Sequence, residues 1–116
     1  MKDKEMNVVI VDDDIELSSS ISEVLSDARL EVSTFETGGQ AIDWIKNHEI
    51  DAVICDINMP SISGYEVMEF ARGKGCDLVI AMSGNGLEWE SKSRGATEFI
   101  RKPIDFRKLI KILKAP

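Results

Sequence analysis

Short apolar runs alternate along this chain with longer stretches in which apolar residues recur every three or four positions. The runs are short enough for strands, and the spacing between them is typical of amphipathic helices. The pattern therefore predicts five strands, each followed by a helix. The five runs are Val8–Val11, Leu30–Phe35, Ala52–Cys55, Leu78–Met82 and Glu98–Ile100.

The helical stretches place their apolar residues on one face. Helix-start signals agree with this periodicity, since Asp14 and Asp105 are suitable N-caps and Ser63 with Glu66 forms a capping-box pattern. The stretches are therefore expected to pack as helices against the strands. Their apolar faces consist of Leu17, Ile21, Val24, Leu25 and Ala28; Ala41, Ile42 and Ile45; Val67, Met68 and Ala71; and Phe106, Leu109, Ile110 and Leu113.

Four of the runs are nearly continuous in apolar character, which is typical of parallel strands covered on both faces. The run Leu30–Phe35 alternates instead and suits an edge strand. Repeated strand–helix alternation implies right-handed crossovers and a doubly wound α/β sheet, most simply in the flavodoxin-like order 2-1-3-4-5. Two glycines and few apolar residues between Ser83 and Gly95 predict a short, mobile fourth helix.

The composition indicates one domain spanning residues 1–116, since 43% of the residues are hydrophobic and 30% are charged. The formal net charge of −7 argues against direct binding to nucleic acid or an anionic membrane. No apolar stretch at the start has signal-peptide length and none elsewhere approaches a membrane span, so a cytoplasmic location is expected. Cys55 and Cys76 are expected to be reduced core residues.

Polar residues follow four of the predicted strands. Asp12 and Asp13 follow the first strand, Asp56 the third, Ser83 the fourth and Lys102 the fifth. In a doubly wound sheet these strand ends share one edge, where ligands bind. Crowded carboxylates repel one another unless a cation neutralises them, and a set of oxygen ligands suits Mg²⁺ when a phosphoryl group shares the site. The sequence therefore predicts a magnesium site with a lysine ammonium beside it.

As a set, these residues resemble the receiver domain of two-component response regulators, and the resemblance runs from Met6 to about Leu113. It implies that Asp56 accepts a phosphoryl group from a sensor histidine kinase or a phosphotransfer protein. It also implies that Asp12, Asp13 and Asp56 hold Mg²⁺ together with the backbone carbonyl of Asn58. Such a domain is a signalling module rather than an enzyme.

The resemblance extends to residues that would complete the pocket and change the surface. It implies that phosphorylation draws Ser83 and Lys102 toward Asp56 and changes the burial of Phe99. Because the fourth helix is short, a monomer or weak dimer with an altered protein-binding surface is expected. Met59-Pro60 and Gly64 match the family's loop after the acceptor, and Pro103 matches the proline of its cis peptide.

Two other function classes remain open. Asp12-x-Asp14 imitates the motif of haloacid-dehalogenase-like phosphatases, in which Asp12 would be the nucleophile, although no second acidic pair follows the fourth strand. A pseudo-receiver that only binds partners is the third class, against which the intact acidic set and Lys102 argue. Single residues also have ordinary interpretations: Ser83 as a turn former, Phe99 as core and His48 as a solvated helix end.

Overall fold

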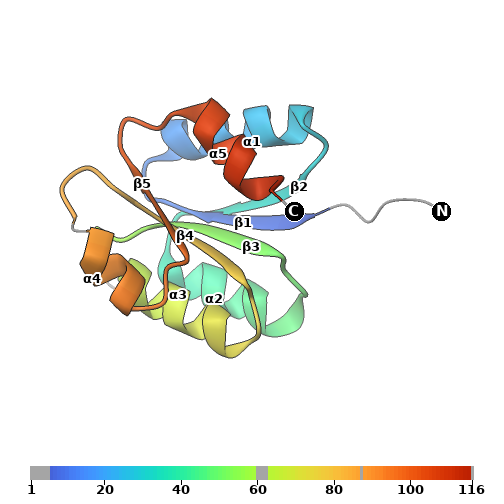
Figure 1. The fold of residues 1–116 in the computed structure, drawn as a ribbon. Helices are drawn as coiled ribbons and strands as arrows, with labels where there is room; N and C mark the ends of the chain where they lie inside the picture. The colour runs from blue at the N-terminus through green and yellow to red at the C-terminus, as the bar shows by residue number, and fades with distance from the viewer. Residues whose placement is uncertain (1–5, 60–62, 87, 116) are drawn as a thin grey trace.

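The sheet of this protein is parallel throughout, with strand order β2-β1-β3-β4-β5. The computed structural model describes residues 6–59, 63–86 and 88–115, so the expectations for Met1–Glu5 and for Pro60 lie outside the described residues. The predicted doubly wound flavodoxin-like fold is confirmed (Figure 1). The elements are β1 (Asn7–Val11), α1 (Ile15–Asp27), β2 (Glu31–Phe35), α2 (Gly38–Asn47), β3 (Ala52–Asp56), α3 (Gly64–Gly73), β4 (Leu78–Ser83), α4 (Glu88–Ser93), β5 (Glu98–Arg101) and α5 (Phe106–Leu113).

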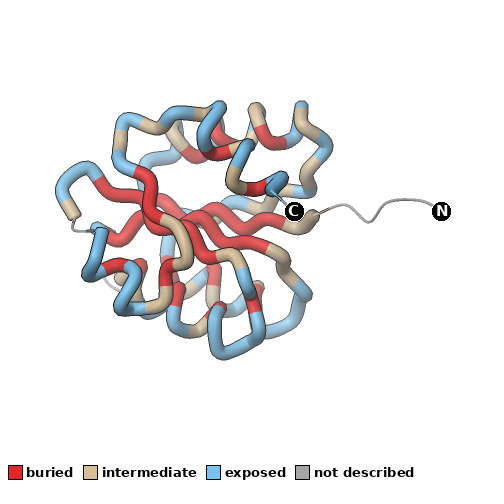
Figure 2. Tube along the Cα trace, in the orientation of Figure 1, coloured by how far each residue is buried: buried red, intermediate tan, exposed pale blue. Residues whose placement is uncertain are grey.

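Helices cover both faces of the sheet, with α1 and α5 on one side and α2, α3 and α4 on the other (Figure 1). The side chains of β1 alternate between the two faces of the sheet. Val8 and Ile10 join the core beneath α1 and α5, whereas Val9 and Val11 join the core over α2 and α3. Successive side chains of a strand point to opposite faces, so a continuous apolar run supplies both cores. Figure 2 shows the inner strands buried between exposed outer helix surfaces.

The alternating run forms edge strand β2, as predicted, but the strand begins at Glu31 rather than at Leu30. The preceding turn explains the difference. Arg29 has a φ of 68°, in the left-handed region, and the amide of Leu30 donates to the carbonyl of Leu25 at 3.0 Å. Leu30 therefore belongs to the turn that ends α1, where its amide and that of Ala28 both donate to the carbonyl of Leu25.

All three predicted helix starts coincide with N-cap residues, and two of them make side-chain capping bonds. The carboxylate of Asp14 accepts from the amide of Leu17 at 3.1 Å, and that of Asp105 accepts from two amides of α5. The predicted capping box at Ser63 and Glu66 is wrong. The Ser63 side chain makes no capping bond, and the amide of Glu66 instead donates to the main-chain carbonyl of Ser63 at 3.1 Å.

The two cysteines and the fourth helix agree with the sequence pattern. Cys55 and Cys76 are free thiols in the core. Helix α4 has six residues, and its short length is confirmed. No helix within the described parts of the chain has the length and apolar character needed to cross a membrane.

Candidate functional site

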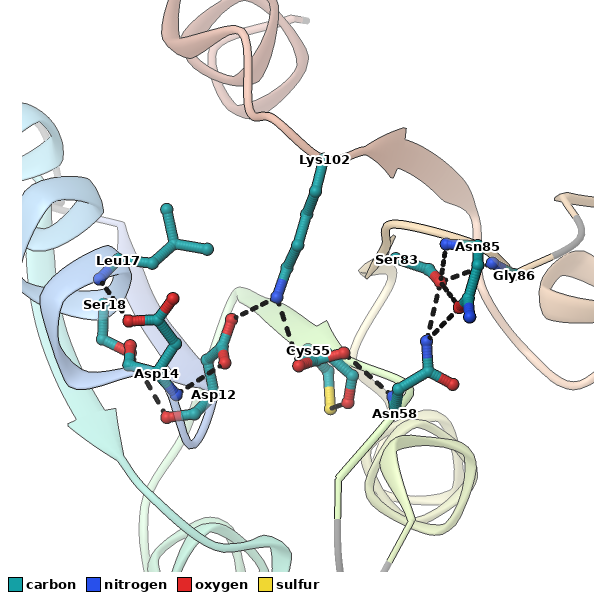
Figure 3. Close-up of polar contacts among 11 residues, drawn as sticks. Asp12, Asp14, Leu17, Ser18, Cys55, Asn58, Ser83, Asn85, Gly86 and Lys102 are labelled. Carbon is teal, nitrogen blue, oxygen red and sulfur yellow. Dashed lines mark hydrogen bonds and ion pairs between the residues drawn. The ribbon is translucent and has the colours of Figure 1, made fainter.

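Four strands of the sheet deliver the predicted polar residues to one edge. Asp56 and Ser83 are the last residues of β3 and β4, Asp12 directly follows β1, and Lys102 directly follows β5. The amide of Lys102 also donates to the carbonyl of Ser83 at 2.9 Å, which fixes the loop after β5 against the end of β4. The parallel topology therefore brings together residues up to 90 positions apart in the sequence (Figure 3).

Three carboxylates form the centre of this site. Asp12 and Asp56 are buried, with 0% and 4% of their surfaces exposed, whereas Asp13 is exposed. One oxygen of each lies within 4.8 Å of the others, a grouping that could hold a metal ion. Carboxylate oxygens are the ligands that Mg²⁺ prefers, and the exposed side of the group leaves room for the waters that this ion retains. The residues present therefore fit Mg²⁺.

The ammonium of Lys102 pairs with both buried carboxylates, and Figure 3 shows it pointing toward Asp12. Its Nζ is 3.1 Å from Oδ2 of Asp12 and 3.2 Å from Oδ2 of Asp56. Burial raises the pKa of Asp12, against the lowering effect of the amide of Asp14 and of Lys102. Burial lowers the pKa of Lys102, but the two carboxylates raise it more, so the pKa ends above its usual value. The ammonium therefore stays charged beside the acceptor position.

Main-chain amides hold the remaining carboxylate oxygens in place. Oδ1 of Asp12 accepts from the amide of Asp14 at 2.9 Å, and Oδ1 of Asp56 accepts from the amide of Asn58 at 2.9 Å. Both bonds reach two residues along the chain, which fixes each carboxylate against its own strand end. The peptide bond between Lys102 and Pro103 is cis, as the resemblance implied.

The hydroxyl of Ser83 is occupied within its own loop. Its oxygen accepts from the side-chain amide of Asn58 at 2.9 Å, from the amide of Gly86 at 2.6 Å and from the amide of Asn85 at 3.2 Å. The Asn58 amide also donates to the side chain of Asn85 at 2.9 Å (Figure 3). The turn-forming interpretation of Ser83 is therefore confirmed. Asn85 was missed, although an amide side chain between two glycines indicates a turn able to reach a neighbouring loop.

The predicted switch aromatic, Phe99, lies in the core over α2 and α3 with 8% of its surface exposed. It pairs with Ala81 across β4 and β5, and the guanidinium of Arg101 lies 5.1 Å from the centre of its ring. Phe99 is therefore a core residue in this structure.

Gly64 explains how the start of α3 approaches the end of β3 so closely. A Cβ atom at this position would lie 2.6 Å from Cα of Ile57 and would also overlap the main chain of Asp56. Real Cβ atoms are not found at such distances, and the obstacle is backbone rather than a flexible side chain. Glycine is therefore required here, as the matching loop position suggested.

The Cys55 thiol lies next to the Asp56 carboxylate in sequence but is not a reactive nucleophile. Cys55 is fully buried, and burial raises its pKa well above its usual value, with the charges of Asp56 and Asp12 raising it further. The thiolate is the reactive form of cysteine. Cys55 is therefore a structural residue of β3, and the reactive groups of the site are oxygens and one ammonium.

Comparison with known proteins assigns this geometry to a family. The family model of the response regulator receiver domain matches residues 8–114. The cell cycle response regulator CtrA of Brucella ovis is 31% identical over 109 residues, covering 90% of this chain and 47% of that protein. The phosphoglycerate transport system transcriptional regulatory protein PgtA of Salmonella typhimurium is 25% identical over 118 residues, covering 98% of this chain and 28% of that protein.

Solved structures show the same likeness. Chemotaxis protein CheY4 of Vibrio cholerae superposes with a TM-score of 0.87 at 27% identity, covering 96% of this chain and 98% of that one. A CheY-like receiver domain protein of Methanospirillum hungatei superposes with a TM-score of 0.88 at 26% identity, covering 96% and 92%.

The chain spans less than half the length of the curated relatives named above, 47% of one and 28% of the other. The match nevertheless covers almost the whole of this chain, including every strand end that contributes to the acidic pocket. The chain therefore belongs to the response regulator receiver domain family of two-component signalling, whose members are phosphoacceptors in signalling rather than enzymes.

Proposed function

We propose that this receiver accepts a phosphoryl group on Asp56 from a phosphohistidine of a sensor kinase or phosphotransfer protein, and that Mg²⁺ is required. The observation that carries this proposal is the pocket itself. The Asp56 carboxylate lies at a buried strand end, 3.2 Å from the Lys102 ammonium and within metal-sharing distance of Asp12 and Asp13. These are the charges that phosphoryl transfer needs around a carboxylate nucleophile.

In the proposed transfer, a carboxylate oxygen of Asp56 attacks phosphorus in line with the donor nitrogen. A P–O bond forms as the P–N bond breaks, and the electron pair stays on the imidazole, which leaves as a neutral ring when its other nitrogen is protonated. Lys102 stabilises the phosphoryl oxygens from its position against Oδ2 of Asp56. Mg²⁺ supplies further positive charge when bound, held by Asp12, Asp13, Asp56 and the carbonyl of Asn58.

The proposed signal is a movement of the loop after β4. Lys102 already contacts Asp56, so the expected approach to the acceptor concerns Ser83 alone. The acyl phosphate adds about −1.5 to −2 charges. This charge would draw the Ser83 hydroxyl away from its bonds to Asn58 and Gly86 and toward the phosphoryl group. The movement would change the burial of Phe99 and reshape a protein-binding surface.

Incubation with acetyl phosphate and Mg²⁺ tests the proposed function against its alternatives. A single phosphoryl adduct that is removed by slow hydrolysis and is not formed when EDTA is present supports the receiver function. Continuous release of phosphate through an adduct on Asp12 would indicate a phosphatase. No adduct under any Mg²⁺ concentration would indicate a module that only binds partners.

We further propose a cytoplasmic protein that acts on another protein, without direct binding to nucleic acid or membrane. The small α4 offers little surface for a strong homodimer, so a monomer or weak dimer is expected with and without activation. Sedimentation with and without Mg²⁺ and beryllofluoride, an acyl-phosphate mimic, tests this. A tight dimer formed only with beryllofluoride, through residues 87–99, would contradict it.

A further inference from the structure

Helix α4 is attached to α3 by a cluster of polar side chains that the acidic pocket does not use. Tyr65 of α3 donates its hydroxyl to Oε1 of Glu90 at 2.9 Å. The guanidinium of Arg94 lies 4.4 Å from the centre of the Tyr65 ring, and its Nε is 3.0 Å from Oε2 of Glu69. We call these four residues the α3–α4 clamp: Tyr65 and Glu69 belong to α3, Glu90 belongs to α4, and Arg94 directly follows α4. The two segments lie side by side in Figure 1.

Helix α4 also packs against β5, but little of its own surface is buried. Its single buried residue is Ser91, and the side chain of Trp89 is 69% exposed. A helix this short is not stable alone, and tertiary contacts must fix it. Each clamp contact is partly exposed and individually weak, so a modest change of partners is enough to move the helix.

Ser91 is a possible second hydrogen-bond partner for the Tyr65 hydroxyl, in place of Glu90. Its hydroxyl oxygen is buried and makes no hydrogen bond within the described parts of the chain. A buried hydroxyl without a partner costs free energy, and native structures seldom retain one without reason. Burial raises the pKa of Tyr65, a contact with the Ser91 hydroxyl lowers it, and Glu90 raises it. The contact with Ser91 does not have the geometry of a hydrogen bond, whereas the one with Glu90 does. Two successive residues of α4 therefore lie beside the same tyrosine hydroxyl.

The clamp is also connected to the acceptor. Tyr65 directly follows Gly64, which packs against the main chain of Asp56 and Ile57 without room for a side chain. A shift of the backbone around Asp56 must therefore displace the start of α3, and with it the Tyr65 ring. From the other side, α4 follows the loop that holds Ser83.

We propose that Tyr65 is a two-position switch that sets the orientation of α4: its hydroxyl bonds Glu90 before phosphorylation and Ser91 after it. A rotation of α4 that withdraws Glu90 brings the Ser91 hydroxyl to the tyrosine oxygen and satisfies it. The inference rests on the proposed function, because phosphorylation of Asp56 supplies the driving charge. Tyr65 is a positioning residue in this scheme and takes no part in phosphoryl transfer.

The test is the affinity for Mg²⁺–beryllofluoride, measured by calorimetry in matched variants. Glu90→Ala removes the hydrogen bond made before activation, so binding tightens about threefold to tenfold, the range of one hydrogen bond. Ser91→Ala removes only the contact made after activation, so binding weakens by a similar factor. Glu88→Ala is the control, since Glu88 lies on the same helix and pairs with Lys92 rather than with a clamp residue. Shifts of the same sign in the first two variants, or shifts no larger than that of Glu88→Ala, would overturn the proposal.

Amide hydrogen exchange without beryllofluoride separates the failure of this inference from the failure of the proposed function. Glu90→Ala is expected to speed exchange in residues 88–93 about threefold to tenfold relative to Glu88→Ala, while β3 is unchanged. If wild type does not bind beryllofluoride, the proposed function fails but this result still decides the clamp. Equal exchange in the two variants would show that Glu90 does not hold α4.

Discussion

The acceptor strand and the fourth helix are held by opposite kinds of contact. All five residues of β3 are buried, and the strand is hydrogen-bonded on both sides, to β1 and β4. Helix α4 has one buried residue and depends on an exposed ion pair and a tyrosine hydroxyl. This fold therefore fixes the Asp56 carboxylate rigidly at the end of β3 and holds α4 by contacts that are easier to break.

The acidic pocket differs from the clamp in its electrostatics as well. Its buried carboxylates repel each other, and Lys102 with the amides of Asp14 and Asn58 offsets that repulsion. In the clamp, partly exposed charges are screened by water and salt, so no single contact is strong. A change of charge in the pocket is therefore expected to have a large electrostatic effect. The clamp contacts are weak enough for a small shift of α4 to break them.

The largest expected effect tests the rigidity of the acceptor strand. Gly64→Ala places a methyl group against the main chain of Asp56 and Ile57, so the free energy of unfolding should fall by about 3 kcal/mol, as in overpacked cores. Chemical denaturation measures it. Gly73→Ala is the matched control in the same helix, where a methyl group meets nothing within 4 Å and stability should hold or rise slightly. Equal losses in both variants would refute the close-packing argument.

A smaller effect is expected from removing the pocket's ammonium. Lys102→Met leaves Asp12 and Asp56 without their cation, and in the absence of metal the free energy of unfolding should fall by about 2 kcal/mol. Added Mg²⁺ should restore part of this loss, because it replaces the missing charge. The control is Lys108→Met on the exposed face of α5. Unchanged stability in Lys102→Met would show that the two ion pairs do not offset the repulsion.

The smallest expected effect is a gain. Asp13→Asn relieves repulsion beside Asp12 and Asp56, so the metal-free protein should unfold at a slightly higher temperature while its affinity for Mg²⁺ falls. Calorimetric titration and thermal unfolding measure the two changes. Asp43→Asn, an exposed carboxylate on α2, makes the same charge change outside the pocket. Wild-type Mg²⁺ affinity in Asp13→Asn would rule out this residue as a ligand.

The strand ends of the sheet could be predicted from the sequence, whereas the side-chain contacts between loops and helices could not. Apolar runs identify the strands, and the position of Asp12, Asp56, Ser83 and Lys102 after them places the site, because parallel strand ends share one edge. The contact of Asn85 with Asn58 and the contacts of Tyr65 with α4 could not be predicted. They join residues 25 to 27 positions apart through side-chain geometry that no periodicity encodes.

The errors have a similar origin. Ser63 and Glu66 carry the residue types of a capping box, yet the Ser63 side chain makes no capping bond. Residue type alone does not fix a side-chain rotamer beside a crowded turn. The sequence also did not show that Lys102 and Asp56 are already paired, at 3.2 Å, without a phosphoryl group. Attraction between the ammonium and the carboxylates determines that position, and only the assembled sheet shows it.

The most direct test of the central claim is to map the phosphorylated residue. Borohydride reduces an acyl phosphate to an alcohol, so treatment after incubation with acetyl phosphate and Mg²⁺ converts the modified aspartate into homoserine, which peptide mass spectrometry locates. The account predicts homoserine at position 56 in wild type and in Asp43→Asn, and no labelling in Asp56→Asn. Homoserine at Asp12, or labelling of Asp56→Asn at the wild-type rate, would contradict it.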